Sequence, residues 1–257
     1  MSYSIEHDYR SRGISVASTF SSDDNNRTFN IGASFDSDRI GSSIDTTLAE
    51  RRNTTGFELG VTQALSAEDL VQVGLSATAA RGYLSDPYKV PDVRPRTRNA
   101  GVLMVRWNHF LGPEDGTLRS SYRYYGDSWG IRAHTVAVEW VKPDGQMFTW
   151  TPSLRYYTQT AARFYYDPVY DPAVGAPYPP GYFTNPPQYL SPDQRLSSFG
   201  GIAVGLKLAA RFSPGWNADL KLEQYEQRAK WAAGSGASPG LDPLRATSVQ
   251  LGVAKTF

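Results

Sequence analysis

Apolar and polar residues alternate one by one along several stretches of the chain, which is the period of a β-strand with two different faces. Between residues 202 and 212, Ile, Val, Leu, Leu, Ala and Phe occupy the even positions, and Ala, Gly, Lys, Ala and Arg occupy the odd ones. Residues 216–223 repeat this pattern, and residues 71–76 and 136–140 show shorter versions of it. The pattern predicts strands with one face suited to lipid and one suited to a wet lumen.

Short polar segments typical of hairpin turns recur along the chain, with mostly longer connections between them. The short segments are residues 22–26, 66–69, 112–116, 143–146 and 213–215. The longer connections are roughly 38–53, 82–98, 159–196 and 230–244, with briefer ones near 9–12 and 126–130. Tight turns at one end and long loops at the other are typical of an outer-membrane barrel, where the turns are periplasmic and the loops extracellular.

The segments between these connections predict an all-β fold of about twelve antiparallel strands in a single β-barrel domain over residues 1–257. The strands are expected near 2–8, 12–21, 27–37, 54–65, 70–81, 99–111, 117–126, 130–142, 147–158, 197–212, 216–229 and 245–257. An even number of strands would place both termini on the periplasmic side.

The last predicted strand ends on an aromatic residue. Val249, Leu251, Val253 and Phe257 share one face of it. This ending resembles that of bacterial outer-membrane β-barrels, in which the terminal Phe resembles the signal read by the barrel-assembly machinery, so Phe257 is the expected assembly signal. Lys255 also falls on the apolar face, but close enough to the end for its long side chain to reach the lipid headgroups.

Composition supports the barrel interpretation. No apolar run approaches the length of a transmembrane helix. The hydrophobic fraction is only 40%, as expected for half-apolar strands, while aromatic residues make up 13% and suit interfacial girdles. A net charge of +1 gives no reason to expect nucleic acid as a partner. A soluble β-sandwich would also alternate, but the long strands and the terminal Phe favour the barrel. Because such a protein is exported and Met1 begins no signal peptide, we expect a mature or trimmed form.

Three ordered motifs stand out in the sequence. They are residues 82–90 followed by 94–98, residues 121–131 followed by His134 and Thr135, and residues 155–159 followed by Ala162, Phe164 and Tyr165. They resemble the bacterial domain of unknown function 3570 family, over nearly the whole chain. The resemblance implies an exported outer-membrane barrel without an established substrate. Family members usually have a further strand-forming region before the segment matching Tyr3 to Tyr9, which implies as many as about sixteen strands if that region was removed.

The lumen is the first candidate functional region, because charged residues at alternate strand positions are assigned inward. The pore-lining candidates are Arg106, Arg119, Arg123, Glu139, Arg155, Lys207, Arg211, Lys221 and Glu223. The four arginines at 106, 119, 123 and 155 come from neighbouring strands, so their guanidinium groups would form a basic ladder that favours anions. The alternative is an internal ion-pair network that fills the lumen.

Two loops are further candidates. The loop over residues 80–99 could bind anionic headgroups or fold inward as a constriction, or it could be an ordered loop with solvated or paired charges. The Tyr- and Pro-rich loop over residues 164–192 could present a stiff aromatic surface to a partner or glycan, or form a plug. The rim and loop candidates are Arg81, Tyr83, Asp86, Tyr88, Lys89, Arg94, Arg96, Arg98, Asp127, Trp129 and His134.

Evidence for an enzyme is thin. The histidines are His7, His109 and His134, and His134 follows Asp127 across a short turn. That pair lacks a nucleophile or a water-positioning partner at a suitable spacing. No phosphate loop or metal-ligand spacing appears, so we expect no cofactor and no metal.

The sequence therefore predicts a non-enzymatic outer-membrane protein of a Gram-negative bacterium, a porin-like channel or transport component of an uncharacterised family. Expected partners are outer-membrane lipid and lipopolysaccharide, the barrel-assembly machinery, and either a small anionic solute or a surface protein. The alternatives are a structural or docking barrel whose Tyr- and Pro-rich extracellular loops bind a surface partner and, third, an outer-membrane hydrolase.

Overall fold

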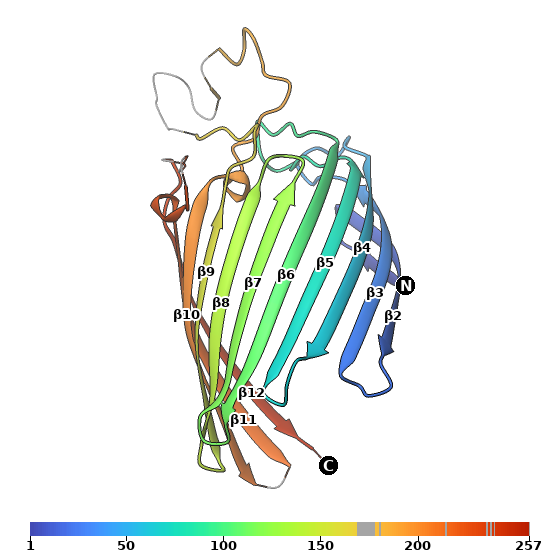
Figure 1. The fold of residues 1–257 in the computed structure, drawn as a ribbon. Coiled ribbons are helices and arrows are strands. Elements are labelled where there is room, and N and C mark those ends of the chain that lie inside the picture. The colour runs from blue at the N-terminus through green and yellow to red at the C-terminus, as the bar shows by residue number, and fades with distance from the viewer. Residues whose placement is uncertain are drawn as a thin grey trace.

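The computed structural model describes residues 1–168, 178–179, 181–213, 215–234, 236, 238 and 240–256. Within them, twelve strands form one antiparallel sheet in chain order (Figure 1). The strands are β1 (Ser2–Ile5), β2 (Tyr9–Ser21), β3 (Arg27–Ile40), β4 (Glu50–Ala64), β5 (Asp69–Gly82), β6 (Thr97–Gly112), β7 (Gly116–Asp127), β8 (Arg132–Asp144), β9 (Phe148–Gln159), β10 (Phe199–Ser213), β11 (Trp216–Arg228) and β12 (Leu244–Lys255). Two short 3-10 helices, η1 (Gln194–Leu196) and η2 (Ala229–Trp231), lie in the connections.

Every predicted strand is present, and the fold class predicted from the alternation is confirmed. The largest differences lie at strand ends. β3 and β4 continue to the Ile40–Glu50 pair, so their connection is shorter than the predicted 38–53. Around this connection both faces carry polar residues, so the alternation that marks a strand disappears from the sequence although the backbone ladder continues.

One face of the sheet is apolar from edge to edge. Leu59, Leu75 and Leu103 are aligned across β4, β5 and β6, and Leu206, Leu222 and Val249 are aligned across β10, β11 and β12. All of these side chains except the half-buried Leu103 are exposed, Leu75 to 53% and Val249 to 65%. A continuous exposed apolar face of this extent is expected where lipid covers the protein.

Tryptophans gather on the apolar face at the tight-turn end of the sheet. The indole N–H of Trp107 donates to Asp69 at 2.8 Å, that of Trp140 to the backbone carbonyl of Asp115 at 2.7 Å, and that of Trp150 to Asp144 at 3.0 Å. Each ring thus has an apolar body and a satisfied polar tip, as in an interfacial girdle. Near the same end, the Lys255 ammonium lies 5.1 Å from the ring centroid of Trp216, which accommodates the charge that the sequence placed on this face.

Tight turns and long loops occupy opposite ends of the sheet, as predicted (Figure 1). The tight turns need the left-handed backbone region: Asn25 has φ 55° and Gly116 has φ 77°. A Cβ atom on Gly116 would lie 2.0 Å from the carbonyl oxygen of Val141, so only glycine fits there. Pro214, in the predicted turn at 213–215, lies outside the described residues.

The sheet is curved but open. Among the described residues β12 pairs only with β11, and β1 pairs only with β2. β1 covers four residues of β2, from Arg10 to Gly13. Phe257, the predicted assembly signal, lies outside the described residues. Among the residues that the structure describes, no helix has the length and apolar character needed to cross a membrane.

The assignment of the two faces can be tested by placing an arginine on each. Leu75→Arg puts a charge at mid-strand on the apolar face and should lower the free energy of unfolding by about 2–4 kcal/mol. Ser76→Arg is the matched control, because Ser76 lies on the other face beside Glu58 and should cost under about 1 kcal/mol. Urea unfolding in lipid vesicles measures both, and equal losses would contradict the assignment.

Candidate pore lining and loop cap

The predicted pore-lining residues lie on the polar face of the sheet. Arg106 is paired with Ser121, Arg119 with Glu139, Arg123 with Thr135 and Arg155 with Ala137. On β10 and β11 the same face carries Lys207, Arg211, Lys221 and Glu223. The strand register therefore places all nine candidates on one face, opposite the apolar one.

These charges fall into two groups. On β10 and β11 the lysines form ion pairs: Lys207 lies 3.5 Å from Asp219, and Lys221 lies 3.1 Å from Glu223. Among the described residues the five arginine candidates, Arg211 on β10 included, do not. In the described part of the chain no carboxylate lies within 4.0 Å of the four guanidinium groups of the arginine stripe, a name we use for Arg106, Arg119, Arg123 and Arg155.

The contacts that the arginine stripe makes are with neutral groups, although Arg119 is paired in register with Glu139. Arg106 donates to the side-chain oxygen of Gln72 at 3.0 Å, and the Arg123 guanidinium lies 5.7 Å from the ring centroid of Tyr125. Arg106, Arg119 and Arg155 are exposed. Apart from Glu139 opposite Arg119, no acidic residue is paired in register with an arginine of the stripe.

The polar face is hollowed. A cavity of about 290 Å³ is lined by Arg106, Asn108, Arg119 and Glu139, among others. The side-chain oxygen of Asn108 is buried without a hydrogen-bond partner. A second cavity, of about 490 Å³, reaches from β2 to Arg123 on β7. A hollow that spans so many strands on the polar side shows that this face is the concave one.

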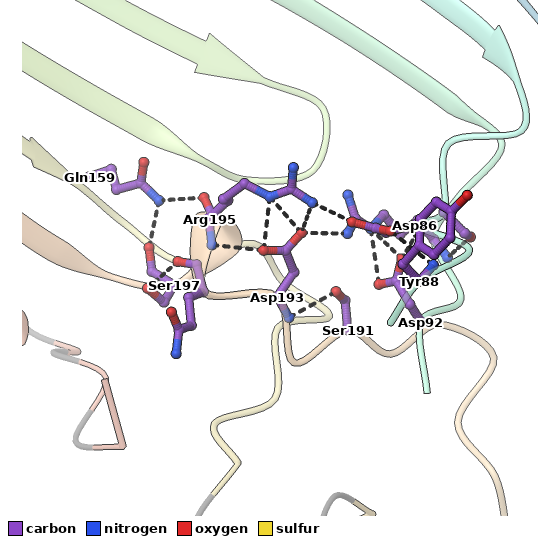
Figure 2. Close-up of polar contacts among 11 residues, drawn as sticks. Asp86, Tyr88, Asp92, Gln159, Ser191, Asp193, Arg195 and Ser197 are labelled. Carbon is purple, nitrogen blue, oxygen red and sulfur yellow. Dashed lines mark hydrogen bonds and ion pairs between the residues drawn. The ribbon is translucent and has the colours of Figure 1, made fainter. Parts of the chain in front are cut away.

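A cluster of ion pairs joins two long loops at the other end of the sheet from the tight turns (Figure 2). Arg94 contacts Asp92 at 2.9 Å and Asp193 at 2.7 Å. Arg195 donates to Asp193 at 2.8 Å and to Asp86 at 2.6 Å. Asp193 thus joins the loop after β5 to the loop after β9. We call this cluster the loop latch.

The loop latch is electrostatically favourable. Burial alone would raise the pKa of Asp193, but hydrogen bonds from Arg195 and Arg94 lower it to about 2. The same hydrogen bond from Arg195 to Asp193 raises the pKa of Arg195 above its usual value. Asp193 is only 1% exposed, so its charge depends on these partners.

An apolar core lies beside the latch. Trp129, Ile131, Ala162 and Leu196 are buried together, and Leu84 packs against them. The Trp129 indole donates to the Thr97 carbonyl at 2.9 Å. The polar-face residues Ala133 and Phe199 are also buried at this end of the strands, at 2% and 9% exposure. The loops therefore form an ordered cap over the concave face.

Asp127 anchors the hairpin that carries Trp129. Its carboxylate contacts Arg98 at 2.7 Å and accepts from the Tyr125 hydroxyl at 2.8 Å. It also accepts from the backbone N–H groups of Trp129 and Ile131, both at 3.0 Å. These four contacts give Asp127 a structural role in the cap.

His134 lies on the apolar face, away from Asp127. Its Nδ1 is 2.7 Å from the Tyr122 hydroxyl, and its ring lies 5.1 Å from that of Tyr124. The structure thus gives the two members of the suggested hydrolase pair separate partners. Among the described residues no group of three or more His, Cys, Asp or Glu side chains could hold a metal ion.

The other loop candidates have varied surroundings. Arg96 contacts Glu50 at 2.7 Å. The Tyr88 hydroxyl donates to Asp8 and accepts from the backbone N–H of Ser43 at 3.0 Å. The backbone N–H of Tyr83 donates to the carbonyl of Arg51 at 2.8 Å. The Lys89 side chain is exposed. Arg81 lies on the apolar side of the sheet. The loop after β5 is thus ordered, with most charges paired.

Three residues of the cap are not among the site candidates predicted from the sequence: Asp193, Arg195 and Gln159. The Gln159 amide donates to the carbonyls of Arg195 and Ser197, at 3.1 and 2.6 Å. A signal was available for one of them, because Ser191-Pro192-Asp193 before Gln194 is a helix-start pattern, and Asp193 does cap η1. Its arginine partners could not be foreseen, because Arg94 lies 99 residues away in the chain.

A family model matches most of the chain. Residues 41–249 match the model of the family described as "Protein of unknown function (DUF3570)". A search of curated proteins gave no match.

Similar solved structures are barrel proteins of the bacterial outer membrane. The siderophore receptor PirA from Pseudomonas aeruginosa matches with a TM-score of 0.59 and 17% identity, over 95% of this chain and 43% of that one. PirA from Acinetobacter baumannii gives 0.58 and 11%, over 97% and 41%, and CdiB from the same organism gives 0.51 and 12%, over 95% and 44%. At these identities the likeness shows the fold, and this chain spans less than half the length of each structure.

The loop latch should protect the cap from hydrogen exchange. Asp193→Asn removes the charge that both arginines share and should destabilise the cap by about 3 kcal/mol, which speeds exchange of the backbone amides in residues 83–96. Lys89→Gln, in the same loop but outside the latch, is the control.

Acid should also release the latch. The pKa of Asp193 is lowered from 3.8 to about 2, so the latch contributes fully above the unfolded value and is lost as pH falls through the folded one. Protection should stay constant from pH 7 to about pH 4 and fall below about pH 3. Loss of protection already at pH 5 would contradict this assignment.

Proposed function

The chain belongs to the DUF3570 family, and we propose that it forms the wall of an outer-membrane conduit for small anionic solutes. The arginine stripe carries this proposal. In the described part of the chain its four guanidinium groups on the concave face have no carboxylate within 4.0 Å, whereas the lysines of β10 and β11 on that face are paired. Unpaired guanidinium groups attract anions and bind carboxylate or phosphate with two parallel hydrogen bonds.

The cap suits the same role. It covers the concave face at the long-loop end, which in this proposal faces the cell exterior. A solute would pass the cap before it meets the arginine stripe. The ion pairs of the loop latch hold the cap in place without using the arginines of the stripe, so gating and selection rest on separate residues.

A docking role is the second candidate, supported by an aromatic cluster in the loop after β9. The ring centroids of Tyr178 and Phe183 lie 4.8 Å apart, and those of Tyr182 and Phe183 lie 5.2 Å apart. Phe183 is 79% exposed. The rest of that Tyr- and Pro-rich tract includes residues 169–177 and 180, which lie outside the described residues. An exposed aromatic group at a loop tip can anchor a surface partner.

Ion selectivity in a planar bilayer tests the first candidate. The protein should open in discrete steps and prefer anions, as read from the reversal potential in a salt gradient. A triple variant, Arg119→Gln, Arg123→Gln and Arg155→Gln, should lower the anion-to-cation permeability ratio several-fold because it removes three of the four positive charges of the arginine stripe.

Arg132→Gln is the matched control. Arg132 is an exposed arginine too, but it lies on β8, where it pairs with Gly126 on the apolar side of the sheet. Its substitution should therefore leave selectivity unchanged. The absence of any conductance would overturn the conduit. Phe183→Ser should not alter conductance in a conduit, and a loss of binding to whole cells in that variant would favour the docking role.

A further inference from the structure

A second group of unpaired arginines lies on the opposite face of the sheet. Arg10, Arg39 and Arg51 are directly paired across β2, β3 and β4. Arg12 lies two residues further along β2, and Arg81 lies on β5 opposite Asn53. All five side chains are exposed. We call the five the outer arginine row.

The outer arginine row shares its face with the apolar belt. Arg10 and Arg12 alternate in step with Ile14, and Arg39 in step with Phe35. Ile14 is 49% exposed and Phe35 44%. The row therefore lies at the long-loop border of the lipid-facing surface, where hydrocarbon would give way to headgroups.

The described residues do not supply counter-ions for this row. In the described part of the chain none of the five arginines has a carboxylate within 4.0 Å. The two nearby carboxylates are engaged elsewhere, Glu50 by Arg96 at 2.7 Å and Asp8 by the Tyr88 hydroxyl.

Like charges at directly paired positions destabilise a sheet. Adjacent strands are about 4.8 Å apart, so three guanidinium groups in register repel one another at close range. An anion that lies between the groups would relieve this repulsion. The charge pattern thus points to an anionic ligand that spans several strands.

The surface around the row is shaped for an amphiphile. One hollow of about 450 Å³ is lined by Arg10, Arg39 and Arg51, together with His7, Asp8 and Glu50. A second, of about 140 Å³, adds Arg12 and Tyr3 to the same three arginines. The Arg12 guanidinium lies 5.7 Å from the ring centroid of Tyr3. Positive hollows thus border an apolar surface, which matches a phosphorylated headgroup with acyl chains beneath it.

We propose that the outer arginine row binds the phosphate groups of lipopolysaccharide in the outer leaflet. The proposal rests on the orientation given under the proposed function, with the long loops outside the cell. Guanidinium groups grip phosphate with two hydrogen bonds each, and neighbouring strands present several of them to one headgroup. The ligand would stabilise the outer edge of β2 to β5 by removing the repulsion among Arg10, Arg39 and Arg51.

Binding to lipid A vesicles tests the proposal. The refolded protein is titrated with vesicles of phosphatidylethanolamine that contain lipid A, with the same vesicles containing dephosphorylated lipid A as reference. The double variant Arg39→Gln, Arg51→Gln should weaken binding to lipid A about tenfold or more, which corresponds to about 1.4 kcal/mol. It should leave binding to the reference vesicles unchanged.

Two further variants keep the test interpretable. Arg39→Lys, Arg51→Lys retains the charge but loses the planar fork, and should bind between wild type and the glutamine variant. Arg132→Gln removes an apolar-side arginine outside the row and should bind like wild type. Retained strand content by circular dichroism checks folding, and if the glutamine pair fails to fold, Arg10→Gln alone takes its place.

The outcomes that overturn the proposal are specific. Equal lipid A binding by wild type and the glutamine variant would sink it. So would full competition by millimolar inorganic phosphate, which would show a site for free anions instead of a lipid headgroup. The proposed conduit can fail without the lipid proposal. In that case the substitutions in the arginine stripe would not affect selectivity, while the outer arginine row would still bind lipid A.

Discussion

A backbone inside a membrane has no water to bond, so every N–H and C=O group must find a partner in the protein. In this chain ladders between sequential neighbours run from β1 to β12 and meet that requirement for the strands between the two edges of the sheet. The ladders fix the register, and the register fixes the two faces. Leu59, Leu75 and Leu103 are thus aligned on one side, while Arg106 and Arg123 lie on the other. The backbone pairing therefore determines which side chains lie on the polar face.

The same constraint leaves the concave face free to carry charge. Its residues make no contribution to the lipid boundary, so they can be paired or unpaired without disturbing the sheet. On β10 and β11 the lysines form ion pairs with Asp219 and Glu223. On β6 to β9 Arg106 and Arg123 contact neutral groups, and Arg119 is paired in register with Glu139 without an ion pair within 4.0 Å. The polar face thus carries both ion-paired lysines and arginines without an ion pair.

The sequence alone predicts strands, because they depend on the local alternation of apolar and polar residues. It does not predict contacts between segments that are distant in the chain. Alternation located the strands, because each side chain must face either lipid or lumen. It lost the ends of β3 and β4, since near the headgroups Arg39 and Arg51 are tolerated on the lipid side and the pattern there looks like a loop. The loop latch was out of reach for another reason: Arg94 and Asp193 meet only because β5, β6, β9 and β10 bring their loops together.

The arginines of this chain show how a counter-ion decides the role of one residue type. Arg94, buried between Asp92 and Asp193, is satisfied within the protein and can only hold the fold together. Among the described residues Arg123 and Arg39 have no carboxylate within 4.0 Å, so an anion would have to come from what each one faces. Arg123 faces the concave hollow, and Arg39 lies at the border of the apolar belt. The role of an exposed arginine without a carboxylate partner therefore depends on what it faces, and its face of the sheet determines what that is.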